Sequence, residues 1–155
     1  IKQVIEDSNQ SVHVDYPFYL LLSERESKDT NDSSLISYFT YDHLTYLFMG
    51  DASKQIEKQL MAAYDLKADV IKVGHHGSNT SSDPDFLDSL DCQIALISCG
   101  YKNKYGHPSV ETLKTLENLH INTLCTSDCG SIAMYSLFHF SFVVTNVGMF
   151  GIIWT

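Results

Sequence analysis

The sequence predicts an α/β fold, a mixed sheet with helices packed on it. Three observations predict it. Short apolar runs alternate along the chain with segments whose apolar residues recur at helical spacing. The helical segments open with capping residues or proline. The length of 155 residues, of which 44% are hydrophobic, suits a single domain spanning 1–155 with one core.

The first third of the chain predicts strands. Residues 16–22 form a strand-like run, and residues 23–34 are a polar and charged loop. Two apolar runs at 35–40 and 44–49 flank a short polar turn. Runs joined in this way predict a β-hairpin.

An amphipathic helix is predicted next, over residues 53–64. Its apolar residues recur at helical spacing and predict one buried face, made by Ile56, Leu60, Met61 and Tyr64. A short apolar strand at 70–73 follows and runs directly into Gly74-His75-His76-Gly77.

Two further helices are predicted from proline positions. Asp83-Pro84 is typical of a cap followed by proline at the first helical position. The apolar face of that helix is expected at Phe86, Leu87 and Leu90. Pro108 is expected to start the other helix, with an inward face made by Val110, Leu113 and Leu116. Strands are predicted at 94–97, 121–125 and 131–135, and a polar loop at 101–107.

The C-terminal segment 134–155 carries no charged residue. Phe138, Phe140 and Phe142 alternate with polar residues, which is a strand period, and 145–148 has a turn composition. We therefore predict a β-hairpin. A membrane-spanning segment is the alternative, because an uncharged stretch of this length is also compatible with one.

Charge and cysteine content narrow the possible functions. The formal net charge is −9, from 10 Lys+Arg and 19 Asp+Glu, which disfavours binding DNA mainly by phosphate neutralisation. A metal-dependent hydrolase remains compatible with an acidic chain.

The four cysteines form no CxxC pair, so a zinc ribbon is not expected. Free buried thiols are one reading, and one or two disulfides in an oxidising compartment are the other.

Candidate functional residues follow the predicted strands. Asp51, the pair His75 and His76, and His107 lie at strand ends or in the loops just after them. Loops at such ends converge in layered α/β folds, and imidazole with carboxylate suits Zn, Mn or Fe. Each residue alone has a simpler role, Asp51 as a helix cap and the histidines as surface or core side chains. Together they predict metal-assisted hydrolysis, with Asp51 suited to bridge two cations.

Three segments resemble the metallo-β-lactamase-like domain of ComEC-type DNA-uptake proteins. They are 47–51, 67–78 and 105–108, and the similarity covers roughly residues 31–133. The resemblance implies half of a four-layer αββα fold, two Zn or Mn ions and phosphodiester hydrolysis during transformation.

The resemblance also implies residue roles. Asp51 would be the bridging ligand and His75 or His76 a terminal ligand, with His75 favoured because it follows the strand first. His107 would lie near the metal or the scissile phosphate, so Asp51 and His107 are the expected catalytic residues. Ser78, Thr80 and Lys104 are the expected substrate contacts.

The implied partners are single-stranded DNA, the membrane-embedded channel portion of the same parent protein and the DNA-uptake machinery. The parent would be membrane-associated, with this domain on the extracytoplasmic side.

The sequence departs from the family pattern at two places, and both bear on whether the chain binds metal and cleaves DNA. The HxHxDH motif is absent, and the nearest approach to it is His13-Val14-Asp15. We expect the chain to start after that motif, to bind metal poorly or not at all alone, and not to cleave DNA alone. Asn79 also stands where many relatives carry a basic residue. The alternatives are another hydrolase of the same superfamily, such as a lactonase or phosphoesterase, and a non-catalytic assembly module of a membrane complex.

Overall fold

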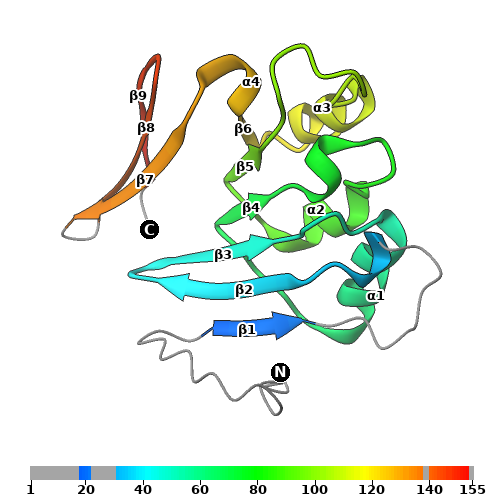
Figure 1. Cartoon of the computed structure of the whole chain (residues 1–155). Helices are drawn as coiled ribbons and strands as arrows, with labels where there is room; N and C mark the ends of the chain where they lie inside the picture. Colours follow the sequence, from blue (N-terminus) through cyan, green and yellow to red (C-terminus); the bar gives the residue numbers. More distant parts are fainter. Residues whose placement is uncertain (1–17, 22–30, 138–139, 154–155) are drawn as a thin grey trace, which may run out of the picture.

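The computed structural model describes residues 18–21, 31–137 and 140–153 (Figure 1). Nine strands and four α-helices occur in these ranges, a short 3₁₀ helix covers Asn31–Ser33, and Gly74–Gly77 forms a tight turn. The strands are β1 (Phe18–Leu21), β2 (Ile36–Tyr41), β3 (Leu44–Phe48), β4 (Val70–Lys72), β5 (Ile94–Ile97), β6 (Asn122–Cys125), β7 (Ile132–Leu137), β8 (Phe140–Thr145) and β9 (Gly148–Ile153). The helices are α1 (Lys54–Ala63), α2 (Pro84–Leu90), α3 (Val110–Asn118) and α4 (Thr126–Cys129).

The main sheet has six strands in the order β1-β2-β3-β4-β5-β6. Strands β1 to β3 pair antiparallel, and β3 to β6 pair parallel. The mixed sheet and the β2–β3 hairpin predicted from the sequence are thus confirmed. The parallel strands bring their carboxyl ends to one edge, where the loops after β3, β4 and β5 meet.

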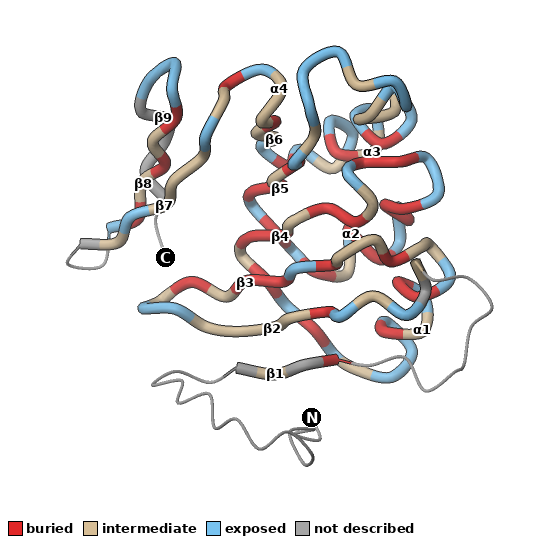
Figure 2. Tube along the Cα trace, in the orientation of Figure 1, coloured by how far each residue is buried: buried red, intermediate tan, exposed pale blue. Residues whose placement is uncertain are grey.

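The principal core lies between the main sheet and helices α1, α2 and α3, which lie along one side of the sheet in Figure 1. Alternate residues of the strands point toward the helices, as the two-residue period of a strand requires. Leu47, Ile71 and Ala95 do so from β3, β4 and β5, and all three are buried. The buried segments in Figure 2 follow these central strands and the inner faces of α1 and α2.

A second sheet packs against the opposite face of the main sheet. It is antiparallel, in the order β7-β8-β9. Val143 of β8 is buried in a smaller cluster with Tyr46, Val70 and Ile94 of the main sheet. The layers therefore run helices, main sheet, second sheet, as Figure 1 shows.

The β2–β3 turn joins the two sheets through polar contacts. His43 Nδ1 lies 3.0 Å from Asp42 Oδ2, and its Nε2 lies 3.1 Å from the Ser141 hydroxyl of β8. The Ser136 hydroxyl of β7 also donates to the Asp42 carboxylate. These hydrogen bonds connect strands β7 and β8 to the turn of the β2–β3 hairpin.

The uncharged C-terminal segment forms strands. Strands β8 and β9 pair antiparallel around a turn at Asn146 and Val147. No helix within the described ranges is both long and apolar enough to cross a membrane.

Helix boundaries follow the sequence signals closely. Asp83 caps α2, accepting from the backbone N–H of Asp85 and Phe86, and Pro84 is its first residue, as predicted. The third helix begins at Val110, slightly after Pro108, because the Ser109 hydroxyl caps it by accepting from the Thr112 N–H.

The predicted inward faces of two helices are partly wrong. Leu116 is buried as predicted, but Val110 and Leu113 are exposed, and α3 buries Thr112 as its second inward residue. The Thr112 hydroxyl donates to the Ser78 carbonyl oxygen at 3.1 Å, and this buried hydrogen bond fixes the rotation of the helix. Met61 of α1 is also exposed, because Ile56, Glu57 and Leu60 form the buried stripe of that helix.

Some sequence expectations fall outside the described residues. His13-Val14-Asp15 and most of the loop 23–34 belong to these parts of the chain.

Candidate functional site

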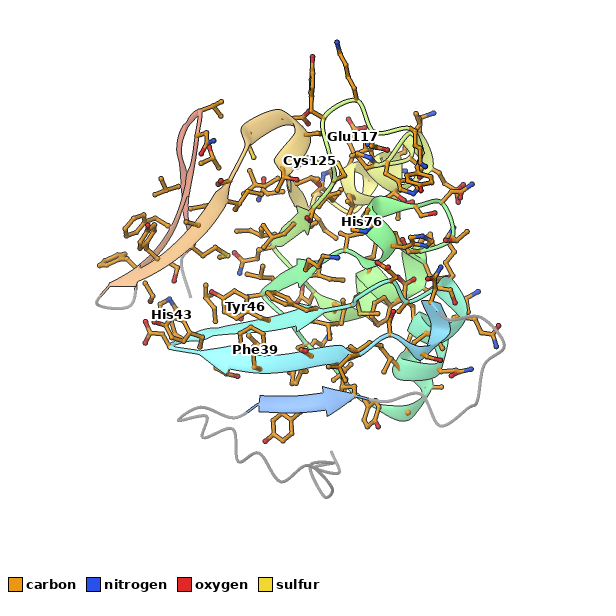
Figure 3. All side chains as sticks on the ribbon, in the orientation of Figure 1. Phe39, His43, Tyr46, His76, Glu117 and Cys125 are labelled. Carbon is orange, nitrogen blue, oxygen red and sulfur yellow. The ribbon has the colours of Figure 1, made fainter. Side chains whose placement is uncertain are left out.

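The candidate residues gather where three parallel strands end. Asp51 follows β3, His75 and His76 follow β4, and Ser98 follows β5. His107 reaches the same place from the loop before α3, since the His75 and His107 ring centroids are 5.8 Å apart. His76 is labelled at this end of the sheet in Figure 3. The shared position predicted for these residues is thus observed.

Asp51 and His76 face each other across this edge. Asp51 Oδ1 lies 3.7 Å from His76 Nε2, and both side chains are close to half exposed. Asp51 does not cap α1, because Ser53 occupies the N-cap position. Its backbone N–H instead donates to the Ser34 hydroxyl at 2.9 Å, which ties the site to the segment before β2.

The second ring nitrogen of His76 has a fixed partner. Nδ1 lies 2.6 Å from the carbonyl oxygen of Ser98. A carbonyl oxygen can only accept, so Nδ1 carries the hydrogen and the Nε2 of the neutral ring keeps a free lone pair. A backbone carbonyl that orients one imidazole nitrogen in this way is the usual support of a metal-binding histidine. Nε2 faces Asp51.

His75 is oriented by a chain of hydroxyls. Its Nδ1 lies 3.2 Å from the Thr80 hydroxyl, which donates to the Ser78 hydroxyl at 3.0 Å. Ser78 is buried and supports Thr80 through this hydrogen bond, and its expected contact with substrate stays a prediction. Thr80 is exposed and holds the His75 ring.

The backbone at both histidines is left-handed. His75 has φ 46° and His76 has φ 56°, values that L residues with a Cβ rarely adopt. A non-glycine residue held there costs about 1–3 kcal/mol, and such strain clusters at functional sites. The His75 N–H donates to the Gly50 carbonyl oxygen at 3.0 Å, and the Ser78 N–H donates to that of His75 at 2.9 Å. These bonds hold the turn in its strained form.

The glycine after the histidines is required by space. Gly77 has φ 79°, and a Cβ on it would lie 2.8 Å from the Pro108 Cβ. The Ser109 N–H also donates to the Gly77 carbonyl oxygen at 2.8 Å. This close approach brings the His107 loop against the histidine turn.

His107 is placed by Asn103. The Asn103 side chain accepts from the His107 N–H at 2.9 Å and donates to the His107 carbonyl oxygen at 2.6 Å. Burial lowers the pKa of His107, and the nearby His75 and His76 lower it further. The ring of Tyr105 stacks on it with an interplanar angle of 16°.

A pocket opens beside these side chains. Its volume is about 460 Å³, and seven residues line it: His76, Ser98, Cys99, Gly100, Asn103, Tyr105 and His107. Asp51 and His75 do not line it, but each neighbours a residue that does, Asp51 beside His76 and His75 beside His107.

Aromatic and basic side chains alternate in the loop that borders the pocket. Tyr101 and Tyr105 are 75% and 70% exposed. Lys102 lies over the Tyr101 ring, and Lys104 lies 4.9 Å from the centroid of Tyr105. Lys104, an expected substrate contact, therefore stands next to a stacked Tyr105–His107 pair.

Sequence reasoning missed three contributors to the site. Ser98 and Asn103 act on the histidines through hydrogen bonds from a strand end and a loop, and no motif marks them. Lys72 of β4 is half-buried near Asp51: burial lowers its pKa, while the Asp51 charge acts in the opposite direction. A lysine within the apolar strand Val70–Lys72 was a signal that could have been used.

The side chain of Glu57 holds the loop that follows the histidines, through hydrogen bonds to its backbone. It is 1% exposed, and its carboxylate accepts the N–H groups of Ser82 at 2.8 Å and Asp83 at 2.7 Å. Burial raises its pKa to about 7, although these two hydrogen bonds act against the shift. The Lys54 N–H adds a third tie, to the Thr80 carbonyl oxygen at 2.8 Å.

The Asp51 carboxylate and His76 Nε2 are suitable ligands for a cation, but two ligands do not complete a coordination shell. Two ligands on a tetrahedral zinc ion lie about 3.3 Å apart, and the 3.7 Å between Asp51 and His76 approaches that spacing. Across the described ranges, no three His, Cys, Asp or Glu side chains converge as a metal-ligand set. The chemistry of the pair fits a divalent cation that would need further ligands.

Comparison with known proteins places the chain in a family. No family model matches it. It is 35% identical to ComE operon protein 3 of Bacillus subtilis over 120 residues, and 33% identical to competence protein ComA of Neisseria gonorrhoeae over 126 residues. These matches cover 76% and 80% of the chain. Recombination protein 2 of Haemophilus influenzae is 37% identical over 70 residues, 45% of the chain.

The matches cover 16%, 18% and 9% of these three relatives, so the chain spans less than a fifth of their length. The chain belongs, as one segment, to the ComEC family of competence proteins.

Proposed function

We propose that the chain is part of a metal-dependent phosphodiesterase domain of a DNA-uptake competence protein. The domain would have the four-layer metallo-β-lactamase fold, and the observed helices, main sheet and second sheet would supply part of it. In the parent protein it would act on single-stranded DNA on the extracytoplasmic side of the membrane, next to a membrane-embedded channel. The names of two relatives, which include ComE operon and competence, support the link to DNA uptake.

The observation that carries the proposal is the geometry of Asp51 and His76. His76 Nε2 faces a carboxylate oxygen at 3.7 Å, and the Ser98 carbonyl oxygen orients the ring through Nδ1. This favours His76 as the terminal ligand, in place of His75, with Asp51 as the carboxylate ligand. A divalent cation such as Zn or Mn would polarise a phosphate oxygen and make a water molecule more acidic.

The other side chains have distinct roles in this proposal. His107 and His75 stand beside the cation position, where a neutral imidazole can accept or donate a proton. Tyr101 and Tyr105 offer exposed rings for base stacking, and Lys102 and Lys104 offer charges for phosphates. Stacking rings interleaved with basic residues are typical of single-strand binding surfaces. A small lactone would use neither feature, which favours a polynucleotide substrate.

The pair Asp51 and His76 makes half a site. Two ligands leave a tetrahedral cation short of partners, so the chain alone should hold metal weakly and leave DNA uncut. This sequence lacks an HxHxDH motif. In the parent protein, such a motif would supply the missing ligands.

Metal binding by the whole chain tests the proposal. After dialysis against trace zinc, we expect less than about a tenth of an equivalent of bound metal, as for a site short of ligands. Titration with zinc at higher concentration should shift the ¹⁵N resonance of His76 Nε2 before those of other histidines. His76→Ala should abolish zinc binding at this concentration, measured as bound zinc per chain.

His120→Ala is the matched control. His120 is exposed and has φ 57°, nearly the same as the φ 56° of His76, so both variants place alanine in the same strained backbone. Zinc binding that His76→Ala leaves unchanged would overturn the assignment of His76. A full equivalent retained on dialysis, and lost in Asp51→Ala, would overturn the half-site.

A further inference from the structure

Two thiols meet at the wall of the pocket. Cys99 follows β5 and Cys125 ends β6, and their Sγ atoms are 3.2 Å apart. Both are free cysteines. A disulfide bond is about 2.05 Å long, so the two sulfurs need to approach by only about 1.2 Å to form one.

The backbone holds these cysteines next to each other. Strands β5 and β6 are parallel neighbours, with Ile97 opposite Cys125. The Thr126 hydroxyl accepts from the Cys99 N–H at 2.9 Å and donates to the Cys99 carbonyl oxygen at 2.8 Å. This double hydrogen bond fixes Cys99 against the residue that follows Cys125, so little chain entropy is lost when the sulfurs join.

Access to the two sulfurs differs. Cys99 is partly exposed and lines the pocket, whereas Cys125 is buried. Burial raises the pKa of Cys125, and its Sγ also lies 3.1 Å from the Ser127 hydroxyl. A reagent entering the pocket therefore meets Cys99 first, and Cys125 stands behind it as the second thiol.

The remaining cysteines lack this arrangement. Cys92 is buried, and burial raises the pKa of its thiol to about 11. The buried Cys129 thiol donates to the Cys125 carbonyl oxygen at 3.0 Å, which directs it to the backbone. Among the four thiols, the Cys99–Cys125 pair is the one with its sulfurs in contact and one sulfur open to the pocket.

We infer that Cys99 and Cys125 form a disulfide by exchange with a low-molecular-weight disulfide, and that this bond restrains the backbone that orients the His76 ring. The Cys99 thiolate attacks one sulfur of the small disulfide, which forms a mixed disulfide and releases one small thiolate. The Cys125 thiolate then attacks the Cys99 sulfur and releases the second small thiolate. The protein loses two protons and two electrons, and the reagent gains both as two thiols.

The bond would act on the site through one residue. Ser98, which immediately precedes Cys99, supplies the carbonyl oxygen 2.6 Å from His76 Nδ1. Joining Cys99 to Cys125 therefore restrains the backbone that fixes the His76 ring. The inference rests on the sulfur geometry and not on the proposed metal or DNA chemistry.

The test uses the whole chain, reduced and then exposed to oxidised glutathione at mildly alkaline pH. We expect each chain to lose two free thiols and the mass of two hydrogen atoms. Proteolysis without reductant should give a peptide joining Cys99 to Cys125. Cys92→Ser, the matched control, should still form this bond, and Cys125→Ser should stop at a stable glutathione adduct on Cys99.

Three results would overturn the pairing: no loss of thiols, a stable adduct on Cys99 of the unaltered chain, or a bond that joins Cys125 to Cys129. The link to the site has its own readout, because the ¹⁵N shifts of His76 should differ between the reduced and oxidised chains. Identical His76 shifts in the two states would overturn that part. Neither readout requires metal or DNA, so these results are independent of the phosphodiesterase proposal.

Discussion

Replacement of Glu57 by glutamine should change how the stability of the protein depends on pH. Glu57 is 1% exposed under the loop that carries Thr80, and its two oxygens accept N–H groups from Ser82 and Asp83. Glu57→Gln keeps the shape of the side chain and removes its charge. The charged neighbours act in opposite directions, since Asp83 raises the pKa of Glu57 and Lys54 lowers it.

The magnitude follows from the pKa shift. Burial raises the pKa of Glu57 from 4.5 to about 7 in the folded protein. Between these values the folded chain holds a proton that the unfolded chain has lost, so the free energy of unfolding falls as pH rises. The stability from this group is fully present below pH 4.5 and is lost as pH rises through about 7, a change of about 3 kcal/mol.

Urea unfolding of both proteins at pH 4 and pH 8 measures this change. The free energy of unfolding of the wild type, minus that of Glu57→Gln, should fall by about 3 kcal/mol between the two conditions. Glutamine can accept from only one of the two N–H groups, which costs about 1–3 kcal/mol, and we expect this cost at both pH values. Glu117→Gln, at an exposed position, should show no such pH dependence. An equal difference between wild type and Glu57→Gln at the two pH values would refute the reasoning.

Three further predictions concern the core, the histidine turn and the loop. Phe86→Ala removes a fully buried side chain and should lower the free energy of unfolding by about 3–5 kcal/mol in urea, and a loss below 1 kcal/mol would contradict its place in the core. Gly77→Ala brings a Cβ to 2.8 Å from Pro108 at φ 79°, so it should destabilise by about 2–4 kcal/mol and lower the melting temperature, and an unchanged melting temperature would disagree with the observed turn. Tyr105→Ala should weaken the binding of an oligothymidine, measured by fluorescence anisotropy at low salt, by about 5- to 150-fold, the loss of about 1–3 kcal/mol expected for one stacked base. Its free energy of unfolding should stay within about 0.5 kcal/mol, because Tyr105 is exposed, and unchanged oligonucleotide binding would exclude a stacking role.

The elements could be predicted where local chemistry decides them. Asp83 and Pro84 specify the start of α2, because a carboxylate cap and a fixed φ act within one turn of the chain. The polar turn between two apolar runs specified the β2–β3 hairpin in the same way. The buried face of a helix could not be predicted from local chemistry alone. Val110 and Leu113 of α3 are apolar yet exposed, because a hydrogen bond from Thr112 to a distant loop sets the rotation of the helix.

For the site, the sequence determined which side chains stand at the strand ends. Asp51, the two histidines and His107 could be placed there because parallel strands bring their carboxyl ends to one edge. The choice between His75 and His76 was not open to sequence reasoning. The proposal of His76 rests on the Ser98 carbonyl oxygen, which orients the ring of His76 from the end of a different strand.

The sequence by itself determined the α/β class, the order of the main-sheet strands and of helices α1 to α3, and the types of residue at the site, because caps, turns and apolar periods act over a few neighbouring residues. The tertiary structure alone decided that Cys99 and Cys125 touch, that the Glu57 side chain is buried beneath the loop, and that Ser78 is buried. The physical reason is common to all three. Burial and contact depend on segments far apart in the chain, and their partners are specified by packing and not by spacing.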